Sequence, residues 1–397
     1  MSLVFVQPDH AELEAGTVFK DFTYPGPLWG ELSSTATAAG ALTIRRKPHT
    51  PVELDLPDLS GVIGAAILVQ YWGGHLGTSE QSVSVNDHPW MLLPQPKGTP
   101  GRPECYYRMG FGNPGIKIPV EQLHAGKNAF SFHAGPQIAY DFKWGFFWIY
   151  SFVVRLYYGD QVQTASCVIR NAAPEQVTGD VASLRLDIET SGMDNVKSID
   201  LVGRFYGYDW DCRGEWLAWR YRYQEGSLAG HLGSIEGSSG SIAWDTTWVP
   251  DQDEAVQVMP LIHLDSGLTV AGPVSTFELR RTGRSVRMFT AIDVPENFGV
   301  RIGQGKTCKI PVTDRAGATR AVLCLSAWSA AHGDEIGLNG NLLVGSFGKE
   351  HDYSMDIFPV PLEILMDGNN FFYAFARTMH HALEVNWPGP ALMLEYR

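Results

Sequence analysis

Segments that alternate between apolar and polar side chains, or that are continuously apolar, recur along most of this 397-residue chain. Residues 183–189 alternate with a period of two, which is typical of a strand with one face in water. Further strands are expected at 198–205, 218–223, 255–264 and 274–279. Capped amphipathic helices are missing from the pattern, apart from single turns near 120–124 and 362–366. The pattern therefore predicts an all-β protein.

Two segments far apart in the chain follow the same template. Residues 118–130 and 360–372 share P-x-E-x-L-x-x-G-x-N-x-F without gaps, and an apolar strand leading to Asn86 or Asn339 lies upstream of each. The template leucine is expected to anchor a loop on the core, and the glycine permits a positive φ before the next strand. Each copy closes on an arginine 27 residues after the template asparagine. These agreements indicate two copies of one fold.

The template resembles galactose-binding-like jelly-roll domains, which are sugar-binding domains attached to many glycoside hydrolases. The resemblance covers about 25 residues in each copy and implies a jelly-roll fold. Residues between the copies have the length and strand rhythm of an immunoglobulin-like sandwich. We therefore expect an all-β, multi-domain β-sandwich protein, with two related jelly rolls flanking an immunoglobulin-like sandwich. The expected domains are a jelly roll over 1–162, the immunoglobulin-like sandwich over 163–281 and a second jelly roll over 282–397.

Charge and cysteine content narrow the range of partners and compartments. The formal net charge is −13 and the Lys/Arg runs are short, so neither nucleic acid nor an anionic membrane is an expected partner. Five scattered cysteines argue against a full disulfide framework, although one or two bridges stay open. The first residues lack a signal-peptide pattern, and the apolar stretch 145–156 is too short to span a bilayer. A soluble protein is expected, either cytoplasmic or a trimmed secreted one.

Aromatic side chains are the strongest indication of a ligand. Sugars present C–H faces that stack on such rings, while neighbouring polar side chains bind the hydroxyls. The expected substrate-binding residues are Trp72, His75, Trp90, Trp210, Trp216, Trp219, Trp248, His381, Glu384 and Trp387. The alternative is that these rings belong to the core or fill the interfaces between domains.

Two loops, 208–216 and 244–254, combine carboxylates with indole rings. Because a glycosidase needs two carboxyl groups about 5–10 Å apart, the loops could together form an acidic, aromatic cleft between domains. The catalytic candidates are Asp209, Asp211, Glu215, Asp245 and Asp251. The first loop also echoes a calcium loop, but an arginine stands where a ligand is expected. We assign no metal ligand and expect no cofactor, with calcium left open.

The fold resemblance and these loops lead to a functional prediction. We expect a carbohydrate-active protein that acts on oligo- or polysaccharides, and we favour a glycoside hydrolase or another polysaccharide-cleaving enzyme. One alternative is a non-catalytic carbohydrate-binding protein. Another is a structural or assembly module whose exposed rings lie in a homo-oligomer interface. An enzyme requires at least two acids in one pocket, whereas a binding module requires only rings and hydrogen-bonding partners.

Overall fold

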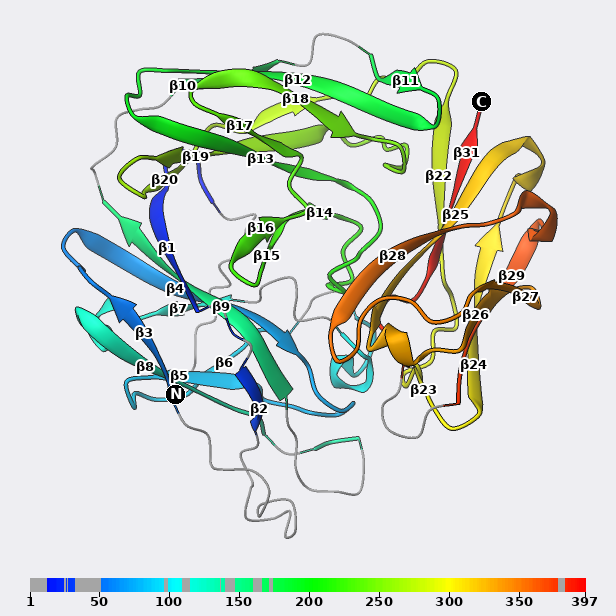
Figure 1. Cartoon of the computed structure of the whole chain (residues 1–397), viewed down its shortest axis with the longest axis horizontal. Helices are drawn as coiled ribbons and strands as arrows, with labels where there is room; N and C mark the ends of the chain where they lie inside the picture. Colours follow the sequence, from blue (N-terminus) through cyan, green and yellow to red (C-terminus); the bar gives the residue numbers. More distant parts are fainter. Residues whose placement is uncertain are drawn as a thin grey trace.

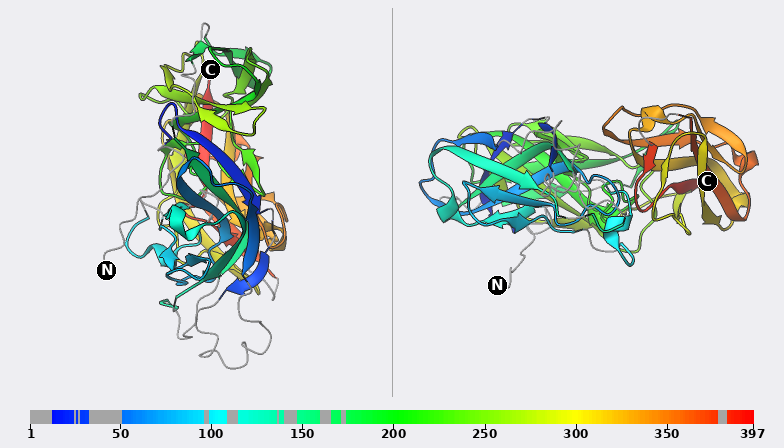
Figure 2. Two further views of the ribbon diagram at one scale, coloured as in Figure 1. Left: turned by 90° about the vertical axis from the view of Figure 1, so that its left-hand side faces the viewer. Right: turned by 90° about the horizontal axis from the view of Figure 1, so that it is seen from below.

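The computed structural model describes residues 13–24, 26, 28–32, 51–95, 99–108, 115–135, 137–139, 147–159, 166–170, 174–377 and 383–397. Strands form nearly all of the regular structure, and their sheets stack into three sandwiches (Figure 1). The predicted all-β, multi-domain sandwich fold is confirmed. Seen from below, the N-terminal and C-terminal sandwiches lie at opposite ends of the molecule (Figure 2). Within the described ranges, no helix is long and apolar enough to cross a bilayer.

The N-terminal sandwich consists of two sheets. The first sheet has the order β1 (Val18–Tyr24), β9 (Phe147–Tyr158), β4 (Val62–Trp72) and β7 (Gly115–Ile118), and β2 (Leu28–Leu32) also pairs with β9. The second sheet has the order β3 (Val52–Leu56), β8 (Gly126–His133), β5 (Ser82–Val85) and β6 (Met91–Leu92). Two short 3-10 turns, η3 (Pro103–Cys105) and η5 (Val120–Gln122), connect strands of this sandwich.

The C-terminal sandwich repeats this order of strands. Its first sheet contains β22 (Ser285–Thr290), β31 (Ala391–Tyr396), β25 (Ala318–Trp328) and β28 (Tyr353–Pro359), with β30 (Leu383–Val385) and β23 (Gly299–Val300) added. Its second sheet has the order β24 (Gln304–Val312), β29 (Gly368–Ala376), β26 (Glu335–Leu338) and β27 (Asn341–Val344). The connecting 3-10 turns are η6 (Arg315–Gly317), η7 (Ala330–His332) and η8 (Leu362–Ile364).

The middle sandwich shares a sheet with the N-terminal one. Its outer sheet contains β10 (Ser166–Arg170), β12 (Val181–Ser191), β11 (Gln176–Thr178) and β18 (Ser239–Asp245). Its inner sheet contains β14 (Leu217–Trp219), β13 (Val196–Tyr206), β19 (Val256–Leu264) and β20 (Thr269–Ala271), with β17 (Gly233–Glu236) and β21 (Ser275–Phe277) at its sides. Strand β20 pairs with β1, which joins the sheets, and a hairpin of β15 (Arg222–Gln224) and β16 (Ser227–Ala229) lies beside them. The predicted boundary near 281 falls between β21 and β22, the one near 162 lies outside the described residues, and the domain limits stay a prediction.

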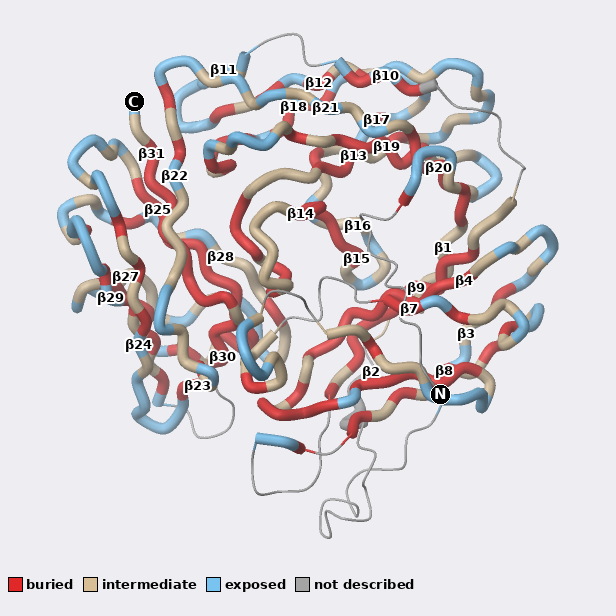
Figure 3. The backbone as a smooth tube through the Cα atoms, turned by 180° about the vertical axis from the view of Figure 1, so that it is seen from behind, coloured by how far each residue is buried: buried red, intermediate tan, exposed pale blue. Residues whose placement is uncertain are grey.

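Each sandwich has an apolar core of its own. Phe130 belongs to the N-terminal core, Leu186 to the middle core and Phe372 to the C-terminal core, and all three are fully buried. Figure 3 shows buried positions along the strands of each sandwich and exposed positions in the outer loops. Because alternate residues of the strands point inward, the period-two pattern of the sequence accounts for these cores.

The repeated template forms the same hydrogen-bond network in both copies. Asn86 donates through Nδ2 to Oδ1 of Asn128 at 2.9 Å, and Asn339 donates to Asn370 at 2.8 Å. The Oδ1 atoms of Asn86 and Asn339 each accept a main-chain N–H at 2.8 Å. The template glycines both have a φ of +93°, which disfavours any residue with a Cβ atom. The template therefore specifies a buried polar junction between a hairpin and the strand that follows.

Replacing Asn370 with alanine is expected to lower the free energy of unfolding by about 2–3 kcal/mol. The side chain is fully buried, and its loss leaves the main-chain N–H and C=O of Met366, both 2.9 Å away, without their partners. Urea unfolding followed by circular dichroism measures the change. Asn369→Ala, at the exposed neighbouring position, is the matched control. An equal loss of unfolding free energy in the two variants would contradict a stabilising role of the Asn370 hydrogen bonds.

Ion pairs tie the middle sandwich to the C-terminal one. Arg284, whose side chain is 2% exposed, pairs with Glu175 at 2.9 Å and with Glu395 of β31 at 3.0 Å. Arg281 also pairs with Glu175, at 3.1 Å, and Arg320 pairs with Glu395 at 2.5 Å. We call these five residues the arginine clamp. Buried charges are tolerated here because each has partners of opposite sign.

Candidate functional site

A pocket of about 630 Å³ opens at one edge of the N-terminal sandwich. Strands β6 and β7, each at the end of its sheet, both contribute to the lining. The two strands are not paired with each other. Its lining is Ile63, Gly64, Ala65, Pro89, Trp90, Met91, Leu92, Ile116, Lys117, Ile118, Pro119, Val120, Glu121 and Gln122. This volume lies within the range of small-molecule sites, about 300–1,000 Å³.

Trp90 is the predicted sugar-binding ring that lines this pocket. It is 42% exposed, and its indole lies against the imidazole of His133, with ring centroids 4.1 Å apart and 42° between the planes. Burial lowers the pKa of His133, so the imidazole is neutral near neutral pH. Ser82 Oγ lies 3.0 Å from Nδ1 of the same imidazole and fixes the ring that supports Trp90. The indole is therefore held in place before any ligand arrives.

The repeated asparagine network shapes the pocket. Asn86 and Asp87 have φ values of +49° and +60°, so the hairpin turns tightly before Pro89 and Trp90. The Nδ2 atom of Asn86 also donates to the main-chain oxygen of Gln122 at 2.7 Å, which fixes the turn that closes the pocket. The hairpin at Asn86 thus positions Trp90 on one side of the pocket and Gln122 on the other.

The polar groups of the lining are suited to hydroxyl groups. Gln122 belongs to the lining, and its buried Oε1 atom has no hydrogen-bond partner in the described part of the protein. Lys117 and Glu121 are exposed and line the same pocket. Strand β7 ends its sheet, so one row of its main-chain N–H and C=O groups points away from the sheet. Lys117, Glu121 and Gln122 were not predicted as site residues, because the template was interpreted as a loop anchored on the core.

The C-terminal copy has different residues at the equivalent edge. Counting from the template asparagines, Leu343 occupies the position of Trp90, and Phe358 occupies the position of Ile116. The ring of Phe358 packs edge-on against Phe347, with centroids 5.0 Å apart, and both contact the core. The exposed indole is therefore a feature of the N-terminal copy alone, although both copies share the fold.

Most of the other predicted sugar-binding rings lie at the junction of the three sandwiches. Trp72 is 4% exposed and stacks on Trp328 of the C-terminal sandwich, with centroids 4.5 Å apart. Around this pair, Tyr150, Cys212 and Tyr353 complete one buried cluster with members from all three sandwiches. Other half-buried or buried rings are His75 beside Trp72, Trp219 in the middle sandwich, and Trp387 against Tyr106.

The rings of the two acidic loops pack on the C-terminal sandwich. Trp210, Trp216 and Trp248 join a cluster whose buried members include Val322 and Met393 of its first sheet. Arg222 lies over the ring of Trp210, 3.6 Å from its centroid. These three indoles therefore lie where the middle sandwich packs on the C-terminal one, and their role in binding sugar stays a prediction.

Asp209 and Asp211 lie inside this junction. Asp209 is fully buried and Asp211 is 3% exposed. Asp209 accepts the main-chain N–H groups of Arg213 at 3.1 Å and Gly214 at 2.6 Å, while Asp211 pairs with Arg213 at 2.8 Å. Burial, followed by the adjacent Asp211, raises the pKa of Asp209 well above its usual range. These contacts use both oxygens of Asp209 and Oδ2 of Asp211, and no cluster of three metal-ligating residues exists among the described residues.

The remaining catalytic candidates have separate environments. Glu215 is half-buried, and its main-chain oxygen accepts from Arg220 at 3.3 Å. Asp245 is exposed and accepts the main-chain N–H of Thr247 at 2.9 Å. Asp251 pairs with Arg281 and accepts from Ser285 Oγ at 2.5 Å, so it extends the arginine clamp. No hydrogen bond links these three carboxylates to Asp209 or Asp211 in the described part of the chain, and their catalytic role stays a prediction.

Glu384 is another buried carboxyl at the junction. It is 4% exposed, and Trp72 Nε1 donates to its Oε2 at 3.0 Å. Burial raises its pKa well above the usual range, and the Trp72 hydrogen bond only partly offsets this. His381 lies outside the described residues. All five cysteines, Cys105, Cys167, Cys212, Cys308 and Cys324, are buried, and none of them forms a disulfide.

Comparison with known proteins gives distant structural matches only. No protein-family model matches the chain, and no curated protein matches it. A β-porphyranase of glycoside hydrolase family 86 from Bacteroides plebeius is 12% identical, with a TM-score of 0.24 over 56% of this chain and 37% of that one. A glycosyl hydrolase family 2 member from Bacteroides cellulosilyticus is 12% identical, with a TM-score of 0.22 over 60% and 27%. The β-glucuronidase of Ruminococcus gnavus is 10% identical, with a TM-score of 0.21 over 76% and 48%.

This chain spans less than half the length of each of these three solved structures. The matched proteins are glycoside hydrolases by their descriptions. Their TM-scores are too low for any inference about the activity of this chain, so its function has to be argued from its own residues.

Proposed function

We propose that this chain is a carbohydrate-binding protein whose N-terminal sandwich holds a sugar unit in the pocket beside Trp90. The observation that carries the proposal is the coincidence of an exposed, supported indole with a pocket of about 630 Å³. The indole can stack on the C–H face of a sugar, and the exposed Lys117 and Glu121 of the lining can form hydrogen bonds with its hydroxyl groups. The apolar walls then cover the remaining face of the ring.

Catalysis by the predicted acids has less support. Two of the five carboxyl groups are buried at the junction, and one is held in an ion pair with Arg281. A glycosidase must present both of its carboxyl groups to the same sugar. Turnover of a glycan by the parent, lost in a folded Asp251→Ala variant, would favour the enzyme instead.

The Trp90→Leu variant is expected to bind sugar about tenfold to a hundredfold more weakly than the parent. Leucine is the residue of the C-terminal copy at this position, so the hairpin tolerates it, while the ring face is lost. Burying an aromatic side chain against a ligand contributes about 1.5–3 kcal/mol, which corresponds to this change in affinity. A glycan array identifies the sugar, and calorimetry with that sugar and its short oligomers measures the dissociation constants.

Ile138→Ala is the matched control for this test. Ile138 is 44% exposed on the N-terminal sandwich but does not line the pocket. The sugar affinity of the Ile138→Ala variant is therefore expected to equal that of the parent. Unchanged sugar affinity in Trp90→Leu, or no binding of any short glycan by the parent at millimolar concentration, would overturn the proposal.

A further inference from the structure

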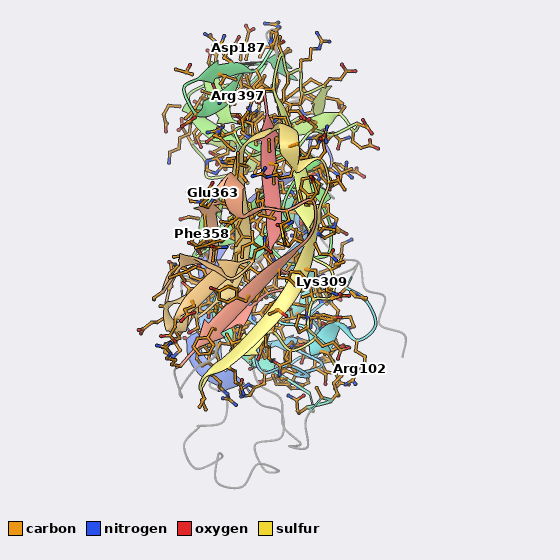
Figure 4. All side chains as sticks on the ribbon, turned by 90° about the vertical axis from the view of Figure 1, so that its right-hand side faces the viewer. Arg102, Asp187, Lys309, Phe358, Glu363 and Arg397 are labelled. Carbon is orange, nitrogen blue, oxygen red and sulfur yellow. The ribbon has the colours of Figure 1, made fainter. Side chains whose placement is uncertain are left out.

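The second sheet of the C-terminal sandwich carries a row of aromatic side chains on its outer face. Phe371, Tyr373 and Phe375 alternate along β29 with the buried residues Phe372 and Ala374. Phe371 is 47% exposed, and the other two are half-buried. Side chains two residues apart on a strand are about 7 Å apart, so the row is about 13–14 Å long. Figure 4 views this sheet, with Lys309 labelled on the neighbouring strand β24.

Glycines on the neighbouring strands allow the rings to lie against the sheet. Gly337 of β26 pairs with Tyr373, and a Cβ atom at Gly337 would lie 2.3 Å from atoms of the tyrosine ring. Gly305 of β24 pairs with Phe375, and a Cβ atom there would lie 3.5 Å from that ring. The tyrosine ring therefore covers the glycine with one face and offers its other face to solvent. The result is a row of rings that lie against the strands of the sheet.

The N-terminal copy lacks this row. Ala129, Ser131 and His133 occupy the equivalent positions of β8, and Ser84 occupies the position of Gly337. The N-terminal copy therefore keeps the fold without phenylalanine or tyrosine at these positions, where the His133 imidazole supports Trp90. Because the copies share the core and the asparagine network, the row needs an explanation other than folding.

Polar groups at the border of the row favour a neutral, hydroxylated ligand. Lys309 pairs with Asp293 at 2.7 Å, and Arg377 pairs with Glu335 at 3.4 Å. Within these two pairs each positive charge lies beside a negative one, and the Arg377 guanidinium also lies over the Phe375 ring, 5.4 Å from its centroid. The pairs therefore offer little net charge to an ionic partner. Thr307 is exposed opposite Tyr373 and can exchange hydrogen bonds with hydroxyl groups.

We propose that this aromatic row is a second binding site, and that its ligand is an extended, uncharged polysaccharide chain. Several sugar units of one chain would lie along β29, with their C–H faces on the rings of Phe371, Tyr373 and Phe375. A row of rings suits a stretched polymer, whereas the pocket beside Trp90 suits one unit or a chain end. The two sites lie on different sandwiches and would bind one polymer more tightly together than either does alone.

Affinity electrophoresis in gels containing uncharged polysaccharides, such as xylan, mannan, β-glucan and agarose, tests the second site. The double variant Phe371→Ala/Tyr373→Ala is expected to lose at least tenfold in affinity for the polymer that retards the parent. Its calorimetric affinity for short oligomers at the Trp90 pocket is expected to stay unchanged. Ile357→Ala is the matched control, because Ile357 is 43% exposed on the other sheet of the same sandwich. Circular dichroism verifies that all the variants are folded.

Three results would overturn this inference. The first is unchanged retardation of Phe371→Ala/Tyr373→Ala. The second is complete loss of polymer binding in Trp90→Leu alone, which would leave the pocket as the sole site. The third is a parent dimer in light scattering that dissociates in the double variant, which would identify a second copy of this chain as the partner. Failure of the Trp90 experiment alone would leave the aromatic row standing, so the two proposals fail separately.

Discussion

The Arg284→Ala variant is expected to unfold with a free energy about 3 kcal/mol below that of the parent. Truncating this side chain leaves the carboxylates of Glu175 and Glu395, which are 1% and 0% exposed, with fewer partners in a buried site. Removing one member of a buried ion pair costs about 3–5 kcal/mol, because the remaining charge is not rehydrated. Arg281 and Arg320 still contact these carboxylates, so we expect the lower end of this range.

Arg280→Ala is the matched control. Arg280 is only four residues from Arg284, but its pair with Glu278 spans 3.9 Å and the two side chains are 75% and 78% exposed. An exposed pair of this kind contributes less than about 1 kcal/mol. Urea unfolding monitored by tryptophan fluorescence compares the variants, and similar losses at the two positions would refute the structural role of the clamp.

The clamp also predicts how stability changes in acid. Burial alone would raise the pKa of Glu395, but hydrogen bonds and charge from Arg320 and Arg284 outweigh it and lower the pKa to about 2. A carboxyl group with a lowered pKa stabilises the folded state at a pH above the ordinary carboxyl pKa. This contribution is lost as the pH falls toward 2. The parent is therefore expected to lose more stability between pH 5 and pH 2 than Arg284→Ala does.

The sequence predicted the parts of the fold that depend on residues of a single sandwich. The strand pattern and the repeated template were sufficient, because the glycine with positive φ and the asparagine that bridges to the hairpin act within one sandwich. The joining of β1 to β20 could not be predicted, because strand pairing over such a distance leaves no local signal. The same limit applies to the arginine clamp, whose members come from distant segments.

The candidate site was predicted only in part, for a similar reason. Trp72 and Trp90 both have glycine, proline or histidine residues close by in the sequence, and the sequence does not separate them. Their exposures are 4% and 42%: Trp328 of another sandwich covers the first, whereas the second lies against His133 of its own sandwich. Asp209 was expected in an open loop, but it is buried where the middle sandwich packs on the C-terminal one.

The buried carboxyl groups of Glu384 and Asp209 are expected to make the protein less stable as the pH rises. Glu384 and Asp209 both have a pKa raised well above the ordinary range, mainly by burial. A raised pKa means that the folded chain keeps a proton which the unfolded chain has already released. The stability from such a group is full below the ordinary carboxyl pKa and is lost as the pH rises toward the folded-state pKa. The slope is about 1.4 kcal/mol per pH unit for each proton.

The variant Glu384→Gln is therefore expected to resist alkaline pH better than the parent. Glutamine keeps an oxygen that can accept from Trp72 Nε1 and has no proton to lose, so the contribution of this position no longer depends on pH. Melting temperatures measured from pH 5 to pH 9 should fall less steeply in Glu384→Gln, and less steeply again when Asp209→Asn is added. Glu363→Gln, at an exposed position of η8, should follow the parent curve. Parallel curves for the parent and Glu384→Gln would mean that Glu384 is already ionised within the junction. The stacked Trp72 and Trp328 would then surround a charged carboxylate, and the junction would have to bind a cation or water to compensate for it.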